Sequence, residues 1–355
     1  MKIHSYRAWL ENIPLSKPYS IAYSTSSDAA IVFLELTLEN GIIGLGAASP
    51  FEEVVGENPA DTLRHLQSGF LDSFVGRDIR HFNQLIDEAS VHFNHLPGSL
   101  AAVDLALHDA FGKFLGIPVL EFYGQKIKPI PTSVTIGIKD IAGTLADARE
   151  YLDMGFQILK IKTGVDVELD LERMIRLREM AGPAIQLRVD ANQGYDLPQL
   201  KRFLAGAEKA GIELIEQPLP AAADEELLQL AAHHRAILVA DESLLDASAA
   251  FQLAHTPQRY GVYNIKLMKC GGIRAAKEIA LLAQQGGIEL FWGCNDETKL
   301  SITAALHVAL SCPNTRYLDL DGSLELSNDI ITGGFRIENG CLIPLNAPGF
   351  GCQLT

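Results

Sequence analysis

The sequence is poor in cysteine and lacks paired-cysteine motifs. Its five cysteines are scattered, odd in number and never spaced as CxxC, which excludes the usual zinc clusters and a disulfide framework. Reduced thiols are typical of the cytoplasm, where we expect the protein to reside. The ten histidines show no HExxH or other paired spacing, so a histidine-ligated zinc site is not predicted either.

Long hydrophobic runs and an excess of positive charge are also missing. No apolar run approaches the length of a membrane span, and residues 1–6 lack the charged and apolar pattern that opens a signal peptide. The formal net charge of −15 argues against non-specific binding of nucleic acid or of an anionic membrane surface. We therefore expect neither nucleic acid nor membrane as a partner.

What remains is the composition of a large globular protein. The 355 residues are 48% hydrophobic and 21% charged, and their number exceeds the size at which a single core stops growing. Two domains are therefore expected. Residues 1–125 indicate an α+β unit, because a hairpin over residues 31–48 turns at Asn40-Gly41 and three helical stretches follow within residues 60–115.

From about residue 131 the pattern becomes a regular alternation of strand and helix. Eight strand-like runs begin 24 to 28 residues apart, with one amphipathic stretch in each gap. The runs are residues 133–138, 158–162, 186–190, 213–217, 237–241, 263–267, 289–292 and 317–321. This spacing predicts a TIM barrel over residues 126–324. A doubly wound sheet is the alternative, but the GxGxxG fingerprint that it would carry after its first strand is absent.

The end of the chain differs from the barrel. Residues 325–355 hold short strand-like pieces and turns, and they add no further βα unit. We expect them to return to the N-terminal unit and complete it. The predicted fold class is therefore α/β, a modified TIM (β/α) barrel with an α+β capping domain made by residues 1–125 and the C-terminal tail.

Two lysines indicate chemistry on the second strand of the predicted barrel. Lys160 and Lys162 bracket one residue in an apolar run that ends at Gly164, and residues i and i+2 of a strand share a face. Two buried ammonium groups side by side lower each other's pKa. A lysine with a depressed pKa can act as a base near neutral pH. The alternative is a strand whose lysines simply reach solvent at its end.

Acidic residues end the next three strands. Asp190, Glu216 and Asp241 are expected to converge, because the C-terminal ends of barrel strands lie at one face. Three converging carboxylates repel one another unless a cation lies among them, and oxygen ligands without His or Cys favour Mg²⁺. The alternative is a solvated acidic rim.

A further lysine, Lys266, ends the sixth strand, on the opposite side of the barrel from Lys162. Two bases on opposite faces of one carbon suit a 1,1-proton transfer, in which one removes an α-proton and the other delivers a proton to the opposite face. A divalent cation would stabilise the enediolate between the two steps. These residues therefore predict inversion of the carbon next to a carboxylate.

Together, the KxK pair, the three strand-end acids and the lysine of the sixth strand closely resemble the muconate lactonizing enzyme subgroup of the enolase superfamily. The resemblance covers almost the whole chain. It implies that Lys162 is one base, that Lys160 tunes it and that Lys266 is the opposing base. It also implies that the three strand-end acids are the metal ligands and that the cofactor is Mg²⁺.

Within this subgroup, the eighth strand is similar to that of the dipeptide epimerases. Asp319 and Asp321 share a strand face, and in that family such a pair binds the α-ammonium group of a dipeptide substrate. Thr135 and Asp296 lie in segments that also resemble the family's, which implies that they contact the substrate. A surface acidic turn is the alternative interpretation of the acid pair.

One position departs from the family's pattern. In the Ala-Glu epimerases an arginine of the early cap loop pairs with the substrate's glutamate, and the corresponding position here is Ser24. Asp296, Glu52 and Glu53 would add negative charge near the pocket. The expected substrate is a dipeptide whose C-terminal residue is neutral or cationic, and the expected reaction inverts the α-carbon of that residue.

Other functions would draw on the same residues. N-acylamino acid racemisation, o-succinylbenzoate synthesis and muconate cycloisomerisation would use the same lysines and metal, but their substrates lack a free α-ammonium group for Asp319 and Asp321. A catalytically silent binder of small carboxylates would have no use for two opposed bases. The oligomeric state is left open, and a homo-oligomer is compatible with the sequence.

Overall fold

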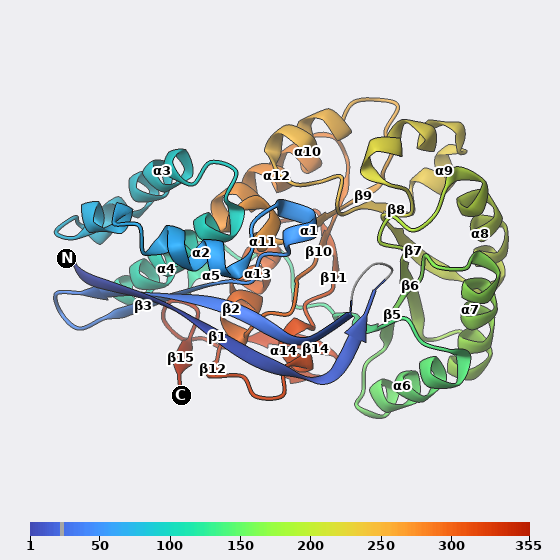
Figure 1. Cartoon of the computed structure of the whole chain (residues 1–355), viewed down its shortest axis with the longest axis horizontal. Coiled ribbons are helices and arrows are strands. Elements are labelled where there is room, and N and C mark those ends of the chain that lie inside the picture. Colours follow the sequence, from blue (N-terminus) through green and yellow to red (C-terminus); the bar gives the residue numbers. More distant parts are fainter. Residues whose placement is uncertain (22–24) are drawn as a thin grey trace.

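The computed structural model describes residues 1–21 and 25–355 of the chain. An N-terminal unit of antiparallel strands and helices lies beside a barrel of alternating strands and helices (Figure 1). In the described residues, no helix combines the length and the hydropathy that crossing a bilayer requires. Ser24, for which we expect a substrate contact, lies outside the described residues.

The barrel strands of the described residues are parallel and form one sheet in the order β11-β10-β9-β8-β7-β6-β5-β4. Their bounds are β4 Val134–Ile136, β5 Ile158–Lys162, β6 Gln186–Asp190, β7 Ile212–Glu216, β8 Leu238–Ala240, β9 Val262–Ile265, β10 Glu289–Trp292 and β11 Thr315–Leu318. The first and last strands also meet, because the Ser133 N–H donates to the Leu318 carbonyl at 2.9 Å. The predicted modified TIM barrel is confirmed.

The strand boundaries agree with the sequence pattern most closely in the interior of the sheet. Residues 158–162, 186–190 and 289–292 are strands to the residue, whereas the last strand ends at Leu318 and not at residue 321. The physical reason is that the Leu320 N–H donates to the hydroxyl of Thr132 at 2.8 Å instead of to a neighbouring strand's backbone. Asp319 and Asp321 therefore lie on a loop at the mouth of the barrel.

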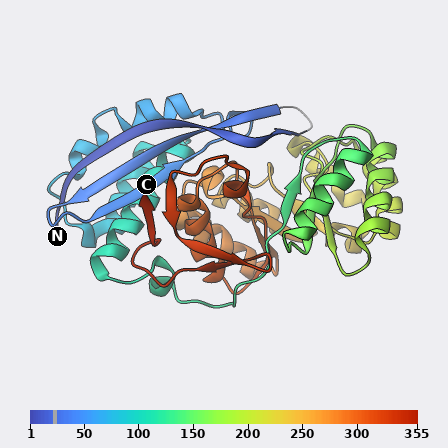
Figure 2. The same ribbon diagram turned by 90° about the horizontal axis from the view of Figure 1, so that it is seen from below.

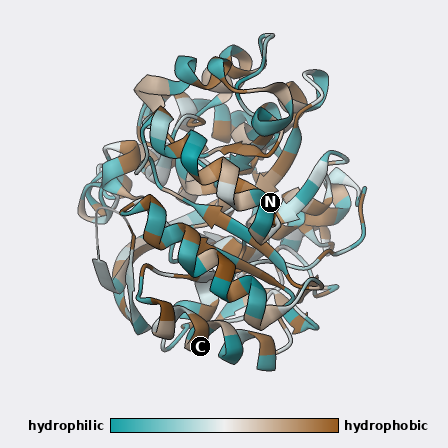
Figure 3. Ribbon diagram, turned by 90° about the vertical axis from the view of Figure 1, so that its right-hand side faces the viewer, coloured by the Kyte–Doolittle hydropathy of each residue, from teal (hydrophilic) through white to brown (hydrophobic). Residues whose placement is uncertain are grey.

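The helices that follow the strands surround the barrel. They are α6 Ile141–Asp153, α7 Val167–Ala181, α8 Leu197–Ala210, η3 Ala221–Gln229, α9 Ala232–Arg235, α10 Ala247–Leu253, α11 Leu267–Cys270, α12 Ile273–Gln285, α13 Lys299–Leu310 and α14 Gly322–Glu325. Aspartates cap four of them, since the side chains of Asp140, Asp166, Asp196 and Asp246 accept N–H groups of the first turn. The outer helices carry hydrophilic and hydrophobic residues on different faces (Figure 3), as expected for helices packed on a buried sheet.

The N-terminal unit is a three-stranded antiparallel sheet in the described residues, with helices on one side. Its elements are β1 Ile3–Ser20, β2 Thr25–Leu38, β3 Ile43–Ala48, α1 Glu52–Val55, α2 Pro59–Leu66, η1 Phe70–Phe74, η2 Ile79–His81, α3 Phe82–His92, α4 Pro97–Leu115 and α5 Val119–Tyr123. Gly44 and Gly46 allow β3 to touch α4, because a Cβ at either position would collide with the α4 backbone.

The C-terminal tail forms two short antiparallel pairs, β12 with β15 and β13 with β14. The strands are β12 Ile331–Gly333, β13 Phe335–Glu338, β14 Cys341–Pro344 and β15 Cys352–Leu354. The tail lies against the N-terminal unit (Figure 2), where the buried carboxylate of Asp109 accepts the N–H groups of Leu45 and Phe350, each at 2.8 Å. The division into a capping domain of residues 1–125 with 325–355 and a catalytic barrel of residues 126–324 stays a prediction.

Candidate active site at the barrel mouth

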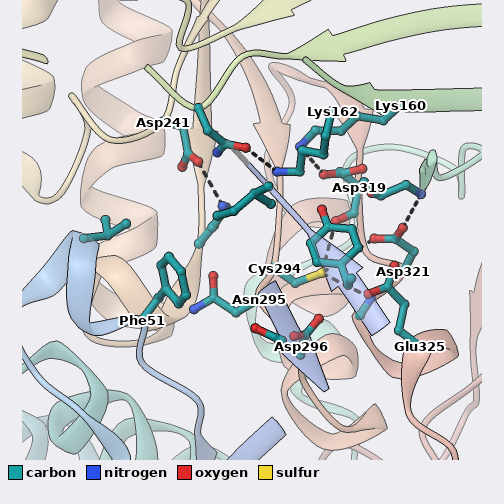
Figure 4. A pocket seen from close by; sticks show the side chains of 18 of the residues that line it. Phe51, Lys160, Lys162, Asp241, Cys294, Asn295, Asp296, Asp319, Asp321 and Glu325 are labelled. Atoms are coloured by element: carbon teal, nitrogen blue, oxygen red, sulfur yellow. Dashed lines mark hydrogen bonds and ion pairs between the residues drawn. The ribbon is translucent and has the colours of Figure 1, made fainter. Parts of the chain in front are cut away.

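A cavity of about 110 Å³ opens at the C-terminal ends of the barrel strands, where the N-terminal unit faces them (Figure 4). Barrel residues that line it include Thr135, Lys160, Lys162, Asp241, Lys266, Asp296, Asp319 and Asp321. The N-terminal unit contributes Tyr19, Ile21, Ser26, Phe51, Val54 and Val55. The structure therefore brings strand-end residues that are far apart in sequence together in one cavity.

Three buried carboxylates lie side by side at this mouth. Asp190 ends β6, Glu216 ends β7 and Asp241 follows β8, and each offers an oxygen within 4.8 Å of the other two. Burial, together with the charge of Asp190, raises the pKa of Glu216 to about 8. Such crowding of negative charge is stable when a cation shares the site.

The donor set of this cluster suits a hard divalent cation. All three ligating groups are carboxylates, with no His or Cys among them, which favours Mg²⁺ over zinc. Next to the cluster, the buried Oε2 of Glu242 has no hydrogen-bond partner in the described residues, while its Oε1 accepts from Asn192 at 3.2 Å. The residues present therefore fit a Mg²⁺ site.

Two lysines flank the carboxylate cluster from different sides of the barrel. Lys162 of β5 donates to Asp190 Oδ2 at 2.7 Å and to Asn192 Oδ1 at 3.0 Å. Lys266, which follows β9, donates to Asp241 Oδ2 at 2.9 Å. A carbon atom held above the cluster would thus have one amine on each side.

Lys160 connects the carboxylate cluster to the acids of the last barrel strand. Its Nζ lies 2.7 Å from Asp319 Oδ2, 2.7 Å from Glu216 Oε2 and 3.2 Å from Asp190 Oδ2. With its side chain 3% exposed, this lysine is buried among three acids and reaches no bulk solvent. The alternative interpretation of the KxK pair, in which the lysines extend into solvent, is therefore wrong.

The expected direction of the lysine pKa shifts is also wrong. Burial lowers the pKa of Lys162, as does Lys160, but Asp190 and Glu216 outweigh both, so that the pKa is raised. The pKa of Lys160 is raised well above its usual value for the same reason, with Asp319 the largest charge. The negative charge of the neighbouring carboxylates therefore determines the direction of both lysine pKa shifts.

The two acids after β11 occupy different environments. Asp319 accepts hydrogen bonds from Ser133 Oγ at 2.5 Å and from Lys160. Burial raises the pKa of Asp319, but Lys160, Ser133 and Lys162 outweigh burial and hold that pKa below its usual value. Asp321 accepts the N–H of Thr135 at 2.6 Å, and burial and the charge of Asp319 raise its pKa to about 7. Thr135 therefore positions Asp321 through its backbone, and the interpretation of the pair as a solvated surface turn is wrong.

Several cavity residues are absent from the sequence-based expectation. Lys269 of α11 donates to the Asp241 carboxylate, and also to its carbonyl at 2.6 Å. Its position one helical turn after Lys266 was the signal that could have identified it. Glu325 lies four residues after Asp321 and lines the cavity beside Asp296.

Glu52 and Glu53, which were expected to add negative charge near the pocket, are exposed on α1. Val54 and Val55 of the same helix line the cavity instead.

Family models match nearly the whole chain. Residues 6–124 match the mandelate racemase / muconate lactonizing enzyme N-terminal domain. Residues 143–355 match the enolase C-terminal domain-like family.

Several named proteins are similar to this chain over almost its whole length. A protein of Desulforapulum autotrophicum named L-Lys-D/L-Arg epimerase is 46% identical over 99% of both chains. The crystal structure of a dipeptide epimerase from Methylococcus capsulatus, complexed with Mg and the dipeptide L-Arg-D-Lys, superimposes with a TM-score of 0.97 at 45% identity, again over 99% of both chains. The L-Ala-D/L-Glu epimerase of Bacillus subtilis is less similar, at 31% identity over 96% of this chain and 93% of its own.

Proposed function

The chain belongs to the mandelate racemase / muconate lactonizing enzyme family of the enolase superfamily, and we propose that it is a Mg²⁺-dependent dipeptide epimerase. The reaction inverts the α-carbon of the C-terminal residue. The observation that carries this proposal is the arrangement of Lys162 and Lys266 on two sides of one buried carboxylate cluster. The same cavity holds the acid pair Asp319 and Asp321 for an α-ammonium group.

The two ends of a dipeptide suit two different parts of the cavity. Its carboxylate belongs near Asp190, Glu216 and Asp241, which would hold the Mg²⁺, and its ammonium group belongs near Asp319 and Asp321. A dipeptide bound at both ends is oriented with its C-terminal α-carbon between the two lysines.

The lysines perform the proton transfer. One neutral amine removes the α-proton from its side, and the ammonium group on the other side delivers a proton to the opposite face. When bound, Mg²⁺ supplies positive charge that stabilises the negative charge developing on the substrate carboxylate. A lysine whose neighbouring carboxylates are neutralised has a lower pKa, as a base near neutral pH requires. Lys160 acts on Lys162 through its own positive charge, which lowers the pKa of that neighbour.

The proposed substrates carry at least one lysine or arginine side chain. The cavity lining contains six acidic residues and four lysines, and a relative named L-Lys-D/L-Arg epimerase and a similar structure that holds L-Arg-D-Lys support this preference. All five cysteines are free thiols, which supports the cytoplasm as the proposed location.

A library experiment tests the substrate class. We expect the purified enzyme, incubated with L,L-dipeptides and Mg²⁺ in D₂O, to label Lys- and Arg-containing dipeptides at the C-terminal α-carbon at least about tenfold faster than Ala-Glu, as expected for charge-assisted binding. Mass spectrometry follows the incorporation. The fastest labelling on Ala-Glu would contradict the proposed preference, and no labelling of any dipeptide would contradict the proposed function.

Asp321 provides a test of ammonium recognition. The carboxylate form binds the substrate's ammonium group, so a pKa of about 7 means that KM falls as the pH rises from 6 to about 7.5. Above about pH 8 the dipeptide's own amine deprotonates and KM rises again. We expect Asp321→Asn to lower kcat/KM about 10- to 100-fold for free dipeptides and to remove the fall in KM. An N-acetylated dipeptide serves as the control substrate, and equal losses on both substrates would contradict this role.

A further inference from the structure

Asp296 and Glu325 form a pair of carboxyl groups on the cavity wall. Asp296 lies on the loop after β10, and Glu325 is the last residue of α14, and Figure 4 shows the two side chains on the same side of the cavity. The two groups hydrogen-bond to each other. In the part of the chain that the structure describes, neither forms an ion pair with a basic side chain.

This arrangement differs from that of the other acids in the cavity. Asp241 is paired with two lysines, Asp319 with Lys160, and Asp321 accepts a backbone N–H. Two adjacent, half-buried carboxyl groups without a cation share a proton, because both cannot be ionised at contact. Burial and the charge of Asp321 raise the pKa of Glu325 well above its usual value, so Glu325 holds the proton and donates it to Asp296.

We propose that Asp296 and Glu325 form the subsite for a lysine or arginine side chain on the N-terminal residue of the substrate, and that this cation replaces the shared proton. Glu325 releases its proton to solvent when the cationic side chain enters, and both carboxylates then accept hydrogen bonds from the ammonium or guanidinium group. Glu325 is thereby a specificity-determining residue. The inference rests on the proposed function, since it assigns one end of the dipeptide to Asp321.

The position of Asp296 and Glu325 favours contact with the side chain of the substrate's N-terminal residue over contact with that of its C-terminal residue. Helix α14 begins directly after Asp321, which belongs to the ammonium subsite, and it ends at Glu325. A side chain on the carbon that carries the ammonium group therefore points toward Glu325, while the reacting carbon lies between Lys162 and Lys266. Tyr19, which lines the same wall, can pack against the methylene stem of a long cationic side chain.

Other charged and titratable groups also face the pair. They are Asp321, Glu297, Lys162, Lys266, Tyr19 and Tyr151. Because these groups act on every dipeptide, a ratio of two substrates isolates the contribution of the pair.

The experiment compares L-Lys-L-Ala with L-Met-L-Ala, a neutral dipeptide of similar length, in the wild type, Glu325→Gln and Asp296→Asn. We expect each substitution to lower kcat/KM for L-Lys-L-Ala roughly 10- to 100-fold, mainly through KM, and to change that for L-Met-L-Ala less than about threefold. Turnover of L-Met-L-Ala shows that the variants fold. Glu53→Gln, an exposed acid on α1, is the matched control and should leave both substrates unchanged.

The proton replacement has its own readout. In the wild type, the ratio of kcat/KM for L-Lys-L-Ala to that for L-Met-L-Ala should rise between pH 6 and 8, because the cation competes with a proton. In Glu325→Gln the ratio should be flat. Equal losses on both substrates, a pH-independent wild-type ratio, or a larger loss on L-Ala-L-Lys than on L-Lys-L-Ala would each overturn the inference. Absence of exchange on every dipeptide would instead overturn the proposed function.

Discussion

Replacing Lys162 or Lys266 by alanine is expected to abolish epimerisation and to leave exchange of the α-proton on one epimer only. In the proposed binding mode each lysine faces one side of the reacting carbon, so the remaining lysine would still remove the proton on its own side and return deuterium to the same face. Inversion requires both lysines. We expect kcat for inversion to fall by about 10³-fold or more in each variant, since one acid-base group contributes about 10²- to 10⁴-fold.

The measurement is proton NMR in D₂O, with each epimer of one dipeptide supplied separately. The two variants should exchange opposite epimers, which a loss of folding cannot imitate. Lys128→Ala, which removes an exposed lysine, is the control and should retain full turnover. If both variants exchanged the same epimer, or if either kept full inversion, the two-base assignment would be wrong.

Replacing Glu216 by glutamine is expected to remove Mg²⁺ binding and turnover together. Glu216 stands between the other two acids in strand order, and the substitution keeps its shape while removing one of three carboxylate ligands. Because a Lewis-acid metal contributes several kcal/mol to the stabilisation of developing charge, we expect kcat/KM to fall by about 10³-fold or more. A chelator should abolish wild-type turnover, and added Mg²⁺ should restore it.

A second readout separates metal binding from catalysis. A ligand that binds only the folded state stabilises it, by about 2.7 kcal/mol at a concentration of 100 Kd, so Mg²⁺ should raise the wild-type Tm by a few degrees. Glu216→Gln should show no such rise, whereas Glu226→Gln, which changes an exposed glutamate, should behave as the wild type. A Mg²⁺-dependent rise of the same size in Glu216→Gln would contradict the assignment of this residue as a ligand.

The barrel was predictable because its signals are local. Runs such as Ile158–Lys162 and Gln186–Asp190 are apolar, β-branched and evenly spaced, and parallel strands of one barrel must end at one face. The residues at those ends could therefore be assembled without coordinates. The end of the last strand was not predictable, because it depends on a hydrogen bond between Leu320 and the distant Thr132 hydroxyl.

The lysine pKa shifts show where the sequence-based argument fails. Two like charges in an apolar core, which is what Lys160 and Lys162 are in the sequence alone, lower each other's pKa. The structure adds Asp190, Glu216 and Asp319 within ion-pair distance of one or both lysines, and the net shift changes sign. Electrostatic energies sum over every charge within several ångströms, so that a pair of residues cannot determine them.

By itself, the sequence determined the fold class, the two opposed lysines and the three strand-end acids of this protein. Strand spacing and strand ends are properties of short segments, and barrel geometry converts them into positions. Only the tertiary structure decided which acids lack a cation, that Glu325 lies beside Asp296 and that Glu52 and Glu53 are exposed and do not line the cavity. Those contacts join segments from different elements, and their distances depend on how the barrel and the N-terminal unit pack together.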